Sequence, residues 1–105
     1  MPDMDYTSLK DVEFTRDGYM VDINDWTPEI GETIAEILDI SLTDRHWEII
    51  NFSREVYLKE DKSASMRRVM KELGTPYQEI FDLFPGLPTR TIAKIAGLPK
   101  PVGCI

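Results

Sequence analysis

The sequence predicts an α+β fold, in which a small N-terminal antiparallel β-hairpin or meander packs on a bundle of about five helices. Three observations support this prediction. An Asp-Gly pair separates two short runs that contain apolar residues, apolar residues then recur at helical spacing as far as residue 95, and an extended arm with two prolines follows. With 105 residues, 42% of them hydrophobic, the chain is expected to form a single domain over residues 1–105, of which 97–105 are a mobile C-terminal arm.

The predicted hairpin consists of Val12–Thr15 and Tyr19–Asp22 on either side of the turn Arg16–Gly18. An Asp-Gly pair readily adopts the positive φ angles of a tight turn, so it is a strong signal for a hairpin. A small antiparallel sheet is therefore expected to open the fold.

Two helices are predicted next. Thr27 and Pro28 suit the cap and the first position of a helix that should end near Asp39. Thr43 is the expected cap of the longest helix, over about Asp44–Glu60. Because the apolar residues of this second helix cover more than one stripe, it is expected to contact other elements on two sides.

The next two predicted helices are Met66–Leu73, closed by Gly74, and a helix from Thr75 to about Phe84. A helix, a Gly turn and a second helix also make up the DNA-binding helix-turn-helix motif. The first helix has bases for phosphate contacts, but the second, which would have to read the groove, has none, so DNA binding is the lesser alternative. The residues concerned are Arg67, Arg68 and Lys71 on the first helix and Gln78, Glu79 and Asp82 on the second.

The final helix should follow Pro88 and stop at Gly97, with Ile92 and Ile95 anchoring the base of the arm to the body. Beyond it, two prolines restrict the backbone, so residues 98–105 should form a semi-rigid, polyproline-like spacer that reaches at most about 25 Å. The prolines are Pro99 and Pro101.

Cys104 is the only cysteine and the penultimate residue. A lone cysteine is commonly a small buried hydrophobe without chemistry. Its position favours a reactive role instead, because chain ends are seldom packed cores and an exposed free thiol is prone to oxidation. Gly103 beside it has no Cβ, which lets a partner's backbone approach the thiol.

The charge is unevenly distributed. The formal net charge is −7, yet residues 86–105 contain three bases, Arg90, Lys94 and Lys100, and no acid. Nearby cations favour a thiolate or persulfide anion, so these three are candidates for positioning the tail or a partner. The alternative is that Arg90 and Lys94 only solvate a helix face. The acidic total disfavours nucleic-acid binding.

The sequence contains no stretch that could span a bilayer and no apolar N-terminal run of signal-peptide length, and a single cysteine excludes an internal disulfide, so a cytoplasmic protein is expected. His46 is the only histidine. One His and one distant Cys do not form a metal site, and neither a metal nor an organic cofactor is expected. His46 is interpreted as a helix residue packed near Trp47 and less readily as a general base for the thiol.

The C-terminal sequence Ala-Gly-Leu-Pro-Lys-Pro-Val-Gly-Cys-Ile, residues 96–105, resembles the C-terminal signature of the DsrC/TusE family of sulfur-relay proteins. Upstream matches cover nearly the whole chain. They are Asp17-Gly18-Tyr19, Asn24-Asp25-Trp26, Leu42-Thr43, His46 to Ile50 and Leu83-Phe84-Pro85. The resemblance implies that Cys104 carries sulfur as a persulfide, received from sulfurtransferases of a TusBCD or DsrEFH type. A tRNA thiolase or a sulfite-reductase-type protein would be the acceptor, with no membrane partner.

Two departures from the family pattern are visible. DsrC proper has a second cysteine eleven positions before the first, where this chain has Ala93, so the intramolecular disulfide that the resemblance implies for DsrC cannot form here. The segment Lys71–Tyr77 is also shorter than in many members. The resemblance leaves two roles open: a persulfide carrier for tRNA 2-thiouridine synthesis or dissimilatory sulfur metabolism, and a non-catalytic, gamma-like accessory chain that docks its tail on a siroheme sulfite reductase.

Overall fold

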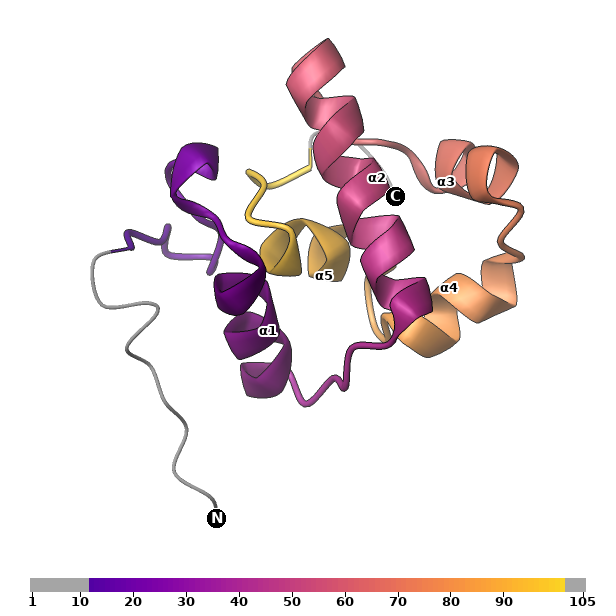
Figure 1. The fold of residues 1–105 in the computed structure, drawn as a ribbon, viewed down its shortest axis with the longest axis horizontal. Coiled ribbons are helices and arrows are strands. Elements are labelled where there is room, and N and C mark those ends of the chain that lie inside the picture. The colour runs from indigo at the N-terminus through magenta and orange to yellow at the C-terminus, as the bar shows by residue number, and fades with distance from the viewer. Residues whose placement is uncertain (1–11, 102–105) are drawn as a thin grey trace.

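The computed structural model describes residues 12–101, which form a helical fold (Figure 1). Within this range there are five α-helices and one short 3₁₀ helix. In chain order they are η2 (Ile23–Asp25), α1 (Pro28–Ile37), α2 (Asp44–Glu60), α3 (Met66–Leu73), α4 (Tyr77–Leu83) and α5 (Pro88–Ile95).

The α+β prediction is wrong, because residues 12–101 contain no β-strand and therefore no N-terminal hairpin sheet. The Asp-Gly turn does form, with Gly18 at φ +89°, but only one isolated bridge, Phe14 to Met20, follows from it. In a paired strand, successive side chains point to opposite faces of the sheet. Here the adjacent Tyr19 and Met20 are both buried, and Asp22 caps η2 by accepting a 2.9 Å hydrogen bond from the Asn24 N–H. The chain therefore bends away where a ladder would have continued.

Local capping explains most helix ends. Thr27 Oγ1 accepts the N–H of Ile30 at 3.3 Å at the start of α1, and Ser65 Oγ accepts the N–H of Arg68 at 3.1 Å at the start of α3. At its C-terminus α3 ends at Gly74, which has the left-handed φ of +60°.

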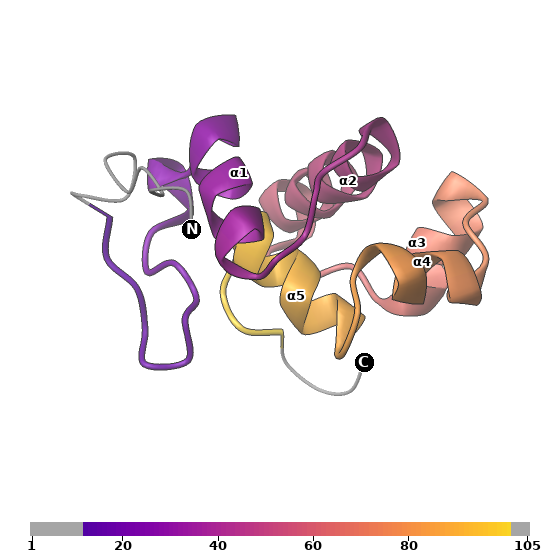
Figure 2. The same cartoon turned by 90° about the horizontal axis from the view of Figure 1, so that it is seen from below.

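Helix α5 lies at the centre of the fold. It contacts both α1 and α2, and α2 also contacts α3, so the prediction that the longest helix meets neighbours on two sides is confirmed (Figures 1 and 2). The two residues predicted to anchor the arm, Ile92 and Ile95, are buried, which is likewise confirmed. They belong to a single core with these residues from the other elements: Tyr19, Met20, Ile30, Ile34, Ile49, Ile50, Met66, Val69, Ile80, Phe84 and Leu98.

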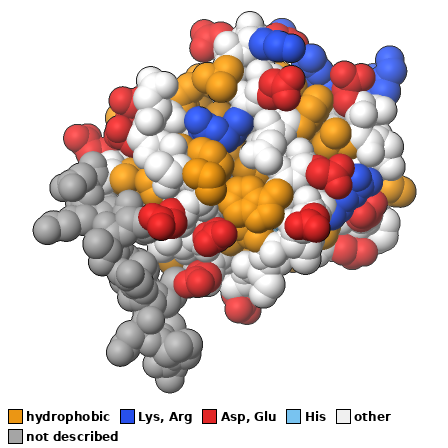
Figure 3. All heavy atoms as spheres, viewed as in Figure 1, with side chains coloured by type: hydrophobic (Ala, Val, Ile, Leu, Met, Phe, Trp, Pro, Cys, Tyr) orange, Lys and Arg blue, Asp and Glu red, His pale blue; other side chains and the backbone are white. Residues whose placement is uncertain are grey.

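On the face shown in Figure 3, acidic side chains are scattered around exposed hydrophobic ones. Within residues 12–101, none of the helices is both long and apolar enough to cross a membrane.

Candidate functional site

The site was predicted at the C-terminal arm, and the structure describes this arm only as far as Pro101. Cys104 and Gly103 lie outside the described residues. Arg90, Lys94, Gly97, Pro99 and Lys100 lie within them, so the geometry of the site is the geometry of the arm's base.

Helix α5 ends in a tight turn. Gly97 adopts the left-handed region at φ +69°, and the Leu98 N–H donates to the carbonyl of Ala93 at 2.9 Å. Leu98 is then only 1% exposed, whereas Pro99 is half-buried and Lys100 is exposed. The first two residues of the arm are therefore part of the core, and solvent exposure begins at Pro99.

Trp26 holds this turn from the far end of the sequence. Its indole N–H donates to the carbonyl of Ile95 at 2.8 Å, which satisfies a carbonyl that the end of α5 would otherwise leave free. The same indole ring covers Gly97, which is buried beneath it.

Arg54, from the middle of α2, holds the next carbonyl. Its Nη1 donates to Ala96 O at 2.7 Å, its Nη2 donates to Ile23 O at 3.2 Å, and its guanidinium lies 4.2 Å from the centre of the Trp26 ring. Burial lowers the pKa of Arg54, but an arginine remains cationic at neutral pH. A charged donor on a helix C-terminus and a cation over an aromatic face are both favourable.

We call Trp26 and Arg54 the exit clamp, because together they bind the last two carbonyls before Gly97. The sequence alone does not indicate that either residue belongs to the site. Trp26 falls in one of the segments that match the family, but the match does not say what the residue does. No feature of the sequence points to Arg54, because a residue in the middle of one helix gives no information about the end of another helix 42 residues later.

The three predicted basic residues come together beside the clamp. An open groove of about 470 Å³ runs along α5, and we call it the basic groove. Lys100 Nζ lies 3.5 Å from Asp17 Oδ2, and Lys94 Nζ lies 5.4 Å from the centre of the Tyr19 ring. The groove is lined by Asp17, Tyr19, Pro85, Gly86, Leu87, Arg90, Thr91, Lys94 and Lys100.

The pKa of the Tyr19 phenol depends on the charges in this groove. Burial raises the pKa of its phenol; the positive charge of Arg90 opposes that rise and the negative charge of Asp17 adds to it. At neutral pH the basic groove is thus lined by a neutral phenol, by Lys100 paired with Asp17, and by two cations, Arg90 and Lys94, that have no carboxylate partner among residues 12–101.

His46 is not available as a base. It is 5% exposed, and its Nδ1 accepts the backbone N–H of Thr43 at 3.0 Å, which places the ring hydrogen on Nε2. Nε2–H donates to the carbonyl of Leu83 at 2.9 Å, and the ring packs edge-on against Phe84. Both nitrogens therefore have structural partners, at the start of α2 and the end of α4.

The helix pair α3 and α4 does not present a groove-reading surface. Glu79 on α4 pairs with Arg45 on α2, and Gln78 donates to Asp82 at 3.0 Å, so the polar side chains of α4 bind other side chains of this chain. On α3, Arg68 is paired with Glu60. The structure also brings together no group of three His, Cys, Asp or Glu side chains able to hold a metal ion within residues 12–101.

The model of the family described as "DsrC like protein" matches residues 7–105. The chain belongs to the DsrC-like family. It is 36% identical to the protein named Sulfurtransferase TusE of Escherichia coli strain K12 over 103 residues, covering 91% of this chain and 94% of that one. It is 37% identical to Sulfurtransferase TusE of Photorhabdus laumondii, covering 91% and 93%.

Solved structures of DsrC proteins share the fold. Allochromatium vinosum DsrC is similar with a TM-score of 0.82 and 33% identity over 100% of both chains. The oxidized gamma-subunit of the dissimilatory sulfite reductase (DsrC) from Archaeoglobus fulgidus has a TM-score of 0.79 and 32% identity, covering 90% of this chain and 92% of that one.

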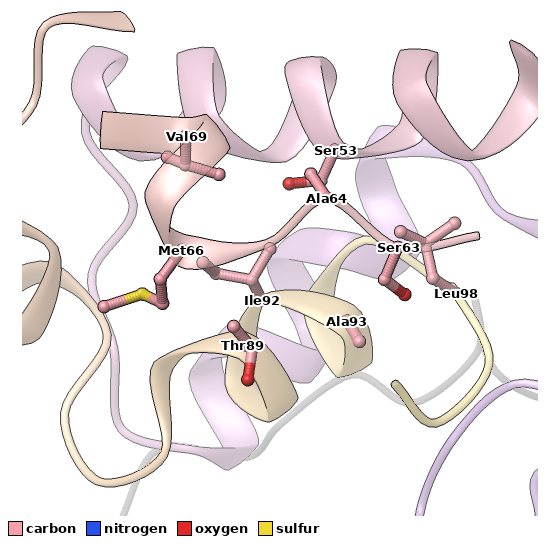
Figure 4. Close-up of a pocket in the computed structure, with 9 residues that line it drawn as sticks. All are labelled: Ser53, Ser63, Ala64, Met66, Val69, Thr89, Ile92, Ala93 and Leu98. Carbon is pink, nitrogen blue, oxygen red and sulfur yellow. The ribbon is translucent and has the colours of Figure 1, made fainter. Parts of the chain in front are cut away.

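At the position where the DsrC pattern noted above has its second cysteine, this DsrC-like chain has Ala93, which is buried. Ala93 borders a cavity of only about 10 Å³ between α5, α2 and the start of α3 (Figure 4). Such a space holds about one water molecule, so it does not serve as a substrate pocket. The cavity is lined by Ser53, Ser63, Ala64, Met66, Val69, Thr89, Ile92, Ala93 and Leu98.

Proposed function

We propose that this chain is a sulfur carrier that accepts sulfur as a persulfide on Cys104 and passes it to a partner protein. Membership of the DsrC-like family and the similarity to proteins named Sulfurtransferase TusE support a sulfur-relay role. The structural observation behind the proposal is the exit clamp. It fixes the last helical carbonyls, so the base of the arm has a defined position in the core as far as Leu98, six residues before the thiol-bearing position.

The chemistry requires only the thiol and a donor. The Cys104 thiolate would attack the terminal sulfur of a donor protein's cysteine persulfide, forming a new S–S bond while the donor's S–S bond breaks and its cysteine leaves as a thiolate. The loaded Cys104 would then present its terminal sulfur to a thiol or an activated substrate of the acceptor. No net oxidation or reduction is needed in the first transfer.

The remaining arm residues would present the thiol. Pro99 and Pro101 restrict the backbone and reduce the entropy lost when the arm enters a partner. Gly103 would let the partner's backbone approach. The bases of the basic groove would favour an anionic sulfur at Cys104 when the arm lies near them.

Partners and pathway follow from the relatives by analogy. We propose donors of the TusBCD or DsrEFH type in the cytoplasm, and an acceptor that is either a tRNA thiolase or a sulfite-reductase-type protein. A chain titled dissimilatory sulfite reductase I (DsrI) is among the similar structures, with a TM-score of 0.81.

The experiment is mass spectrometry of the full chain after incubation with a persulfide-loaded sulfurtransferase. We expect a gain of one sulfur atom that maps to Cys104 and is removed by a thiol reductant. Cys104→Ser should show no gain, with an unchanged circular dichroism spectrum. Absence of any sulfur adduct on Cys104 with several competent donors would refute the carrier role.

A second role is favoured by one comparison, since the Archaeoglobus fulgidus relative is titled a gamma-subunit of a sulfite reductase. As an accessory chain, this protein would co-purify with a siroheme sulfite reductase, and the association would survive Cys104→Ser. A sulfur carrier would instead gain and release sulfur at Cys104, and Cys104→Ser would abolish its function.

A further inference from the structure

We propose that the basic groove binds carboxylate side chains of the protein that receives the arm, as a docking site separate from the thiol. This rests on the proposed carrier function and specifies one part of it, namely how the acceptor is recognised.

The groove presents two cations that are free to bind an anion. Arg90 and Lys94 are one helical turn apart on α5, and neither has a carboxylate partner in the part of the chain that the structure describes. Lys100 adds a third cation to the lining of the groove, although Asp17 at 3.5 Å partly neutralises it. Of the other described bases, Arg45, Lys59 and Arg68 are engaged in ion pairs and Arg54 binds backbone carbonyls, whereas Arg67 and Lys71 on α3 also have no carboxylate partner among residues 12–101.

The groove also has apolar walls. Leu87 is 48% exposed although it is a large hydrophobic residue, and Pro85 and the buried Tyr19 lie beside it. The Lys94 side chain lies over the Tyr19 ring, which fixes the direction of its ammonium group. An acidic segment with an apolar residue among its carboxylates therefore fits this surface better than a free inorganic anion does.

The position of the groove links it to sulfur transfer. Lys100 is both a wall of the groove and a residue of the arm, four positions before Cys104. A protein that binds the arm at its base, around Lys100, would therefore lie beside Arg90 and Lys94. Complementary charge beside the arm would increase the rate at which the two proteins associate and would orient the acceptor relative to the arm.

Charge favours a protein over a nucleic acid as the occupant. The chain has a net charge of −7, and Asp17 lies inside the groove itself. Nucleic-acid surfaces neutralise several successive phosphates with a broad basic face. The three cations of this groove are enough to bind a few carboxylate side chains but not a run of successive phosphates.

The test is an NMR titration of the ¹⁵N-labelled full chain with the peptide acetyl-Glu-Glu-Leu-Glu-Glu-amide at low salt. We expect shifts at the backbone amides of Tyr19, Gly86, Thr91 and Lys94. The isosteric peptide with Gln in place of each Glu should produce none. The double substitution Arg90→Glu with Lys94→Glu should weaken binding by at least about tenfold, because attraction becomes repulsion.

Helix α3 supplies a matched control. Arg67 and Lys71 are also spaced by four residues, are exposed and have no carboxylate partner among the described residues. Arg67→Glu with Lys71→Glu changes the net charge by the same amount and should leave peptide binding within about twofold of the unmodified chain. Equal losses in both double variants would overturn the proposal, since the peptide would then not distinguish the basic groove from the hollow that Arg67 and Lys71 line on α3 or from overall charge.

Three further outcomes are decisive. Equal binding of the Gln peptide, or no binding at all, would refute carboxylate recognition. Tighter binding of a short oligouridine at the same amides would make the occupant a nucleic acid and would also refute the proposal. Sulfur loading of the unmodified chain is a separate measurement: its failure would remove the carrier function without affecting the groove, and loading without peptide binding would refute the groove alone.

Discussion

The indole ring of Trp26 lies against the backbone of Gly97, so closely that a Cβ atom added at residue 97 would be 2.7 Å from Cγ of the ring. Real Cβ atoms do not approach other heavy atoms at this distance, and the surrounding contacts of Trp26 with Ile95 and Arg54 leave the ring little freedom to move. The start of the arm is thus shaped by a residue that precedes it by 71 positions.

Replacing Gly97 by Ala should therefore cost more than the strain of its positive φ. We expect a loss of about 2 to 4 kcal/mol in the free energy of unfolding, from left-handed strain and from overpacking against Trp26. Gly74→Ala is the matched control, because Gly74 has φ +60° but no atom within 4 Å of the added Cβ. It should cost only about 1 kcal/mol. Urea unfolding of both variants is the measurement, and equal losses would contradict the close contact.

Trp26→Phe should reduce the free energy of unfolding by about 1 to 2 kcal/mol, because the carbonyl of Ile95 loses its donor and Arg54 loses part of its aromatic platform. Trp47→Phe provides the comparison. Trp47 packs edge-on against Trp26, but its indole N–H makes no hydrogen bond to any of residues 12–101. Its replacement should cost less, and the reverse order by thermal or urea unfolding would argue against the exit clamp.

The ionisation of Tyr19 should respond to its neighbours in the basic groove. Its pKa is raised in the folded chain, so above about pH 10 the unfolded state loses the proton first and the free energy of unfolding falls as the pH rises. Arg90→Gln should raise this pKa further, and Asp17→Asn should lower it. Tyrosinate absorbance, taken as the difference from a Tyr19→Phe variant, measures the shift. Opposite directions would contradict the arrangement of charges in the groove.

His46→Ala should destabilise the fold without changing the sulfur chemistry. The substitution leaves the Leu83 carbonyl and the Thr43 N–H without the imidazole, and we expect a loss of about 1 to 3 kcal/mol. Under conditions where the variant is folded, the rate at which Cys104 is loaded by a small persulfide should equal that of the unmodified chain. Slower loading with an altered pH profile would show that His46 acts on the thiol.

Helix positions were predictable because their signals are local. Thr27 with Pro28, Thr43 and Gly74 each satisfy or end a helix through contacts within a few residues, and the observed α1, α2 and α3 begin or end where these residues predict. The hairpin prediction was wrong because a turn signal is local whereas a sheet is not. The turn at Gly18 forms. Whether the flanking residues pair as strands depends on the tertiary contacts that bury them, and here Tyr19 and Met20 pack into the helical core instead.

The site divides in the same way. Residue order alone shows that three bases, two prolines and the only thiol lie at the end of the chain, because these features are close together in the sequence. The packing of α1, α2 and α5 around a shared core determines two further features. It brings Arg90, Lys94 and Lys100 into one groove, and it lets Trp26 and Arg54 hydrogen-bond to the end of α5. Sequence by itself determined which chemistry the arm contains. The tertiary structure decided where the base of the arm lies, because hydrogen bonds between residues 42 and 69 positions apart exist only once the chain is folded.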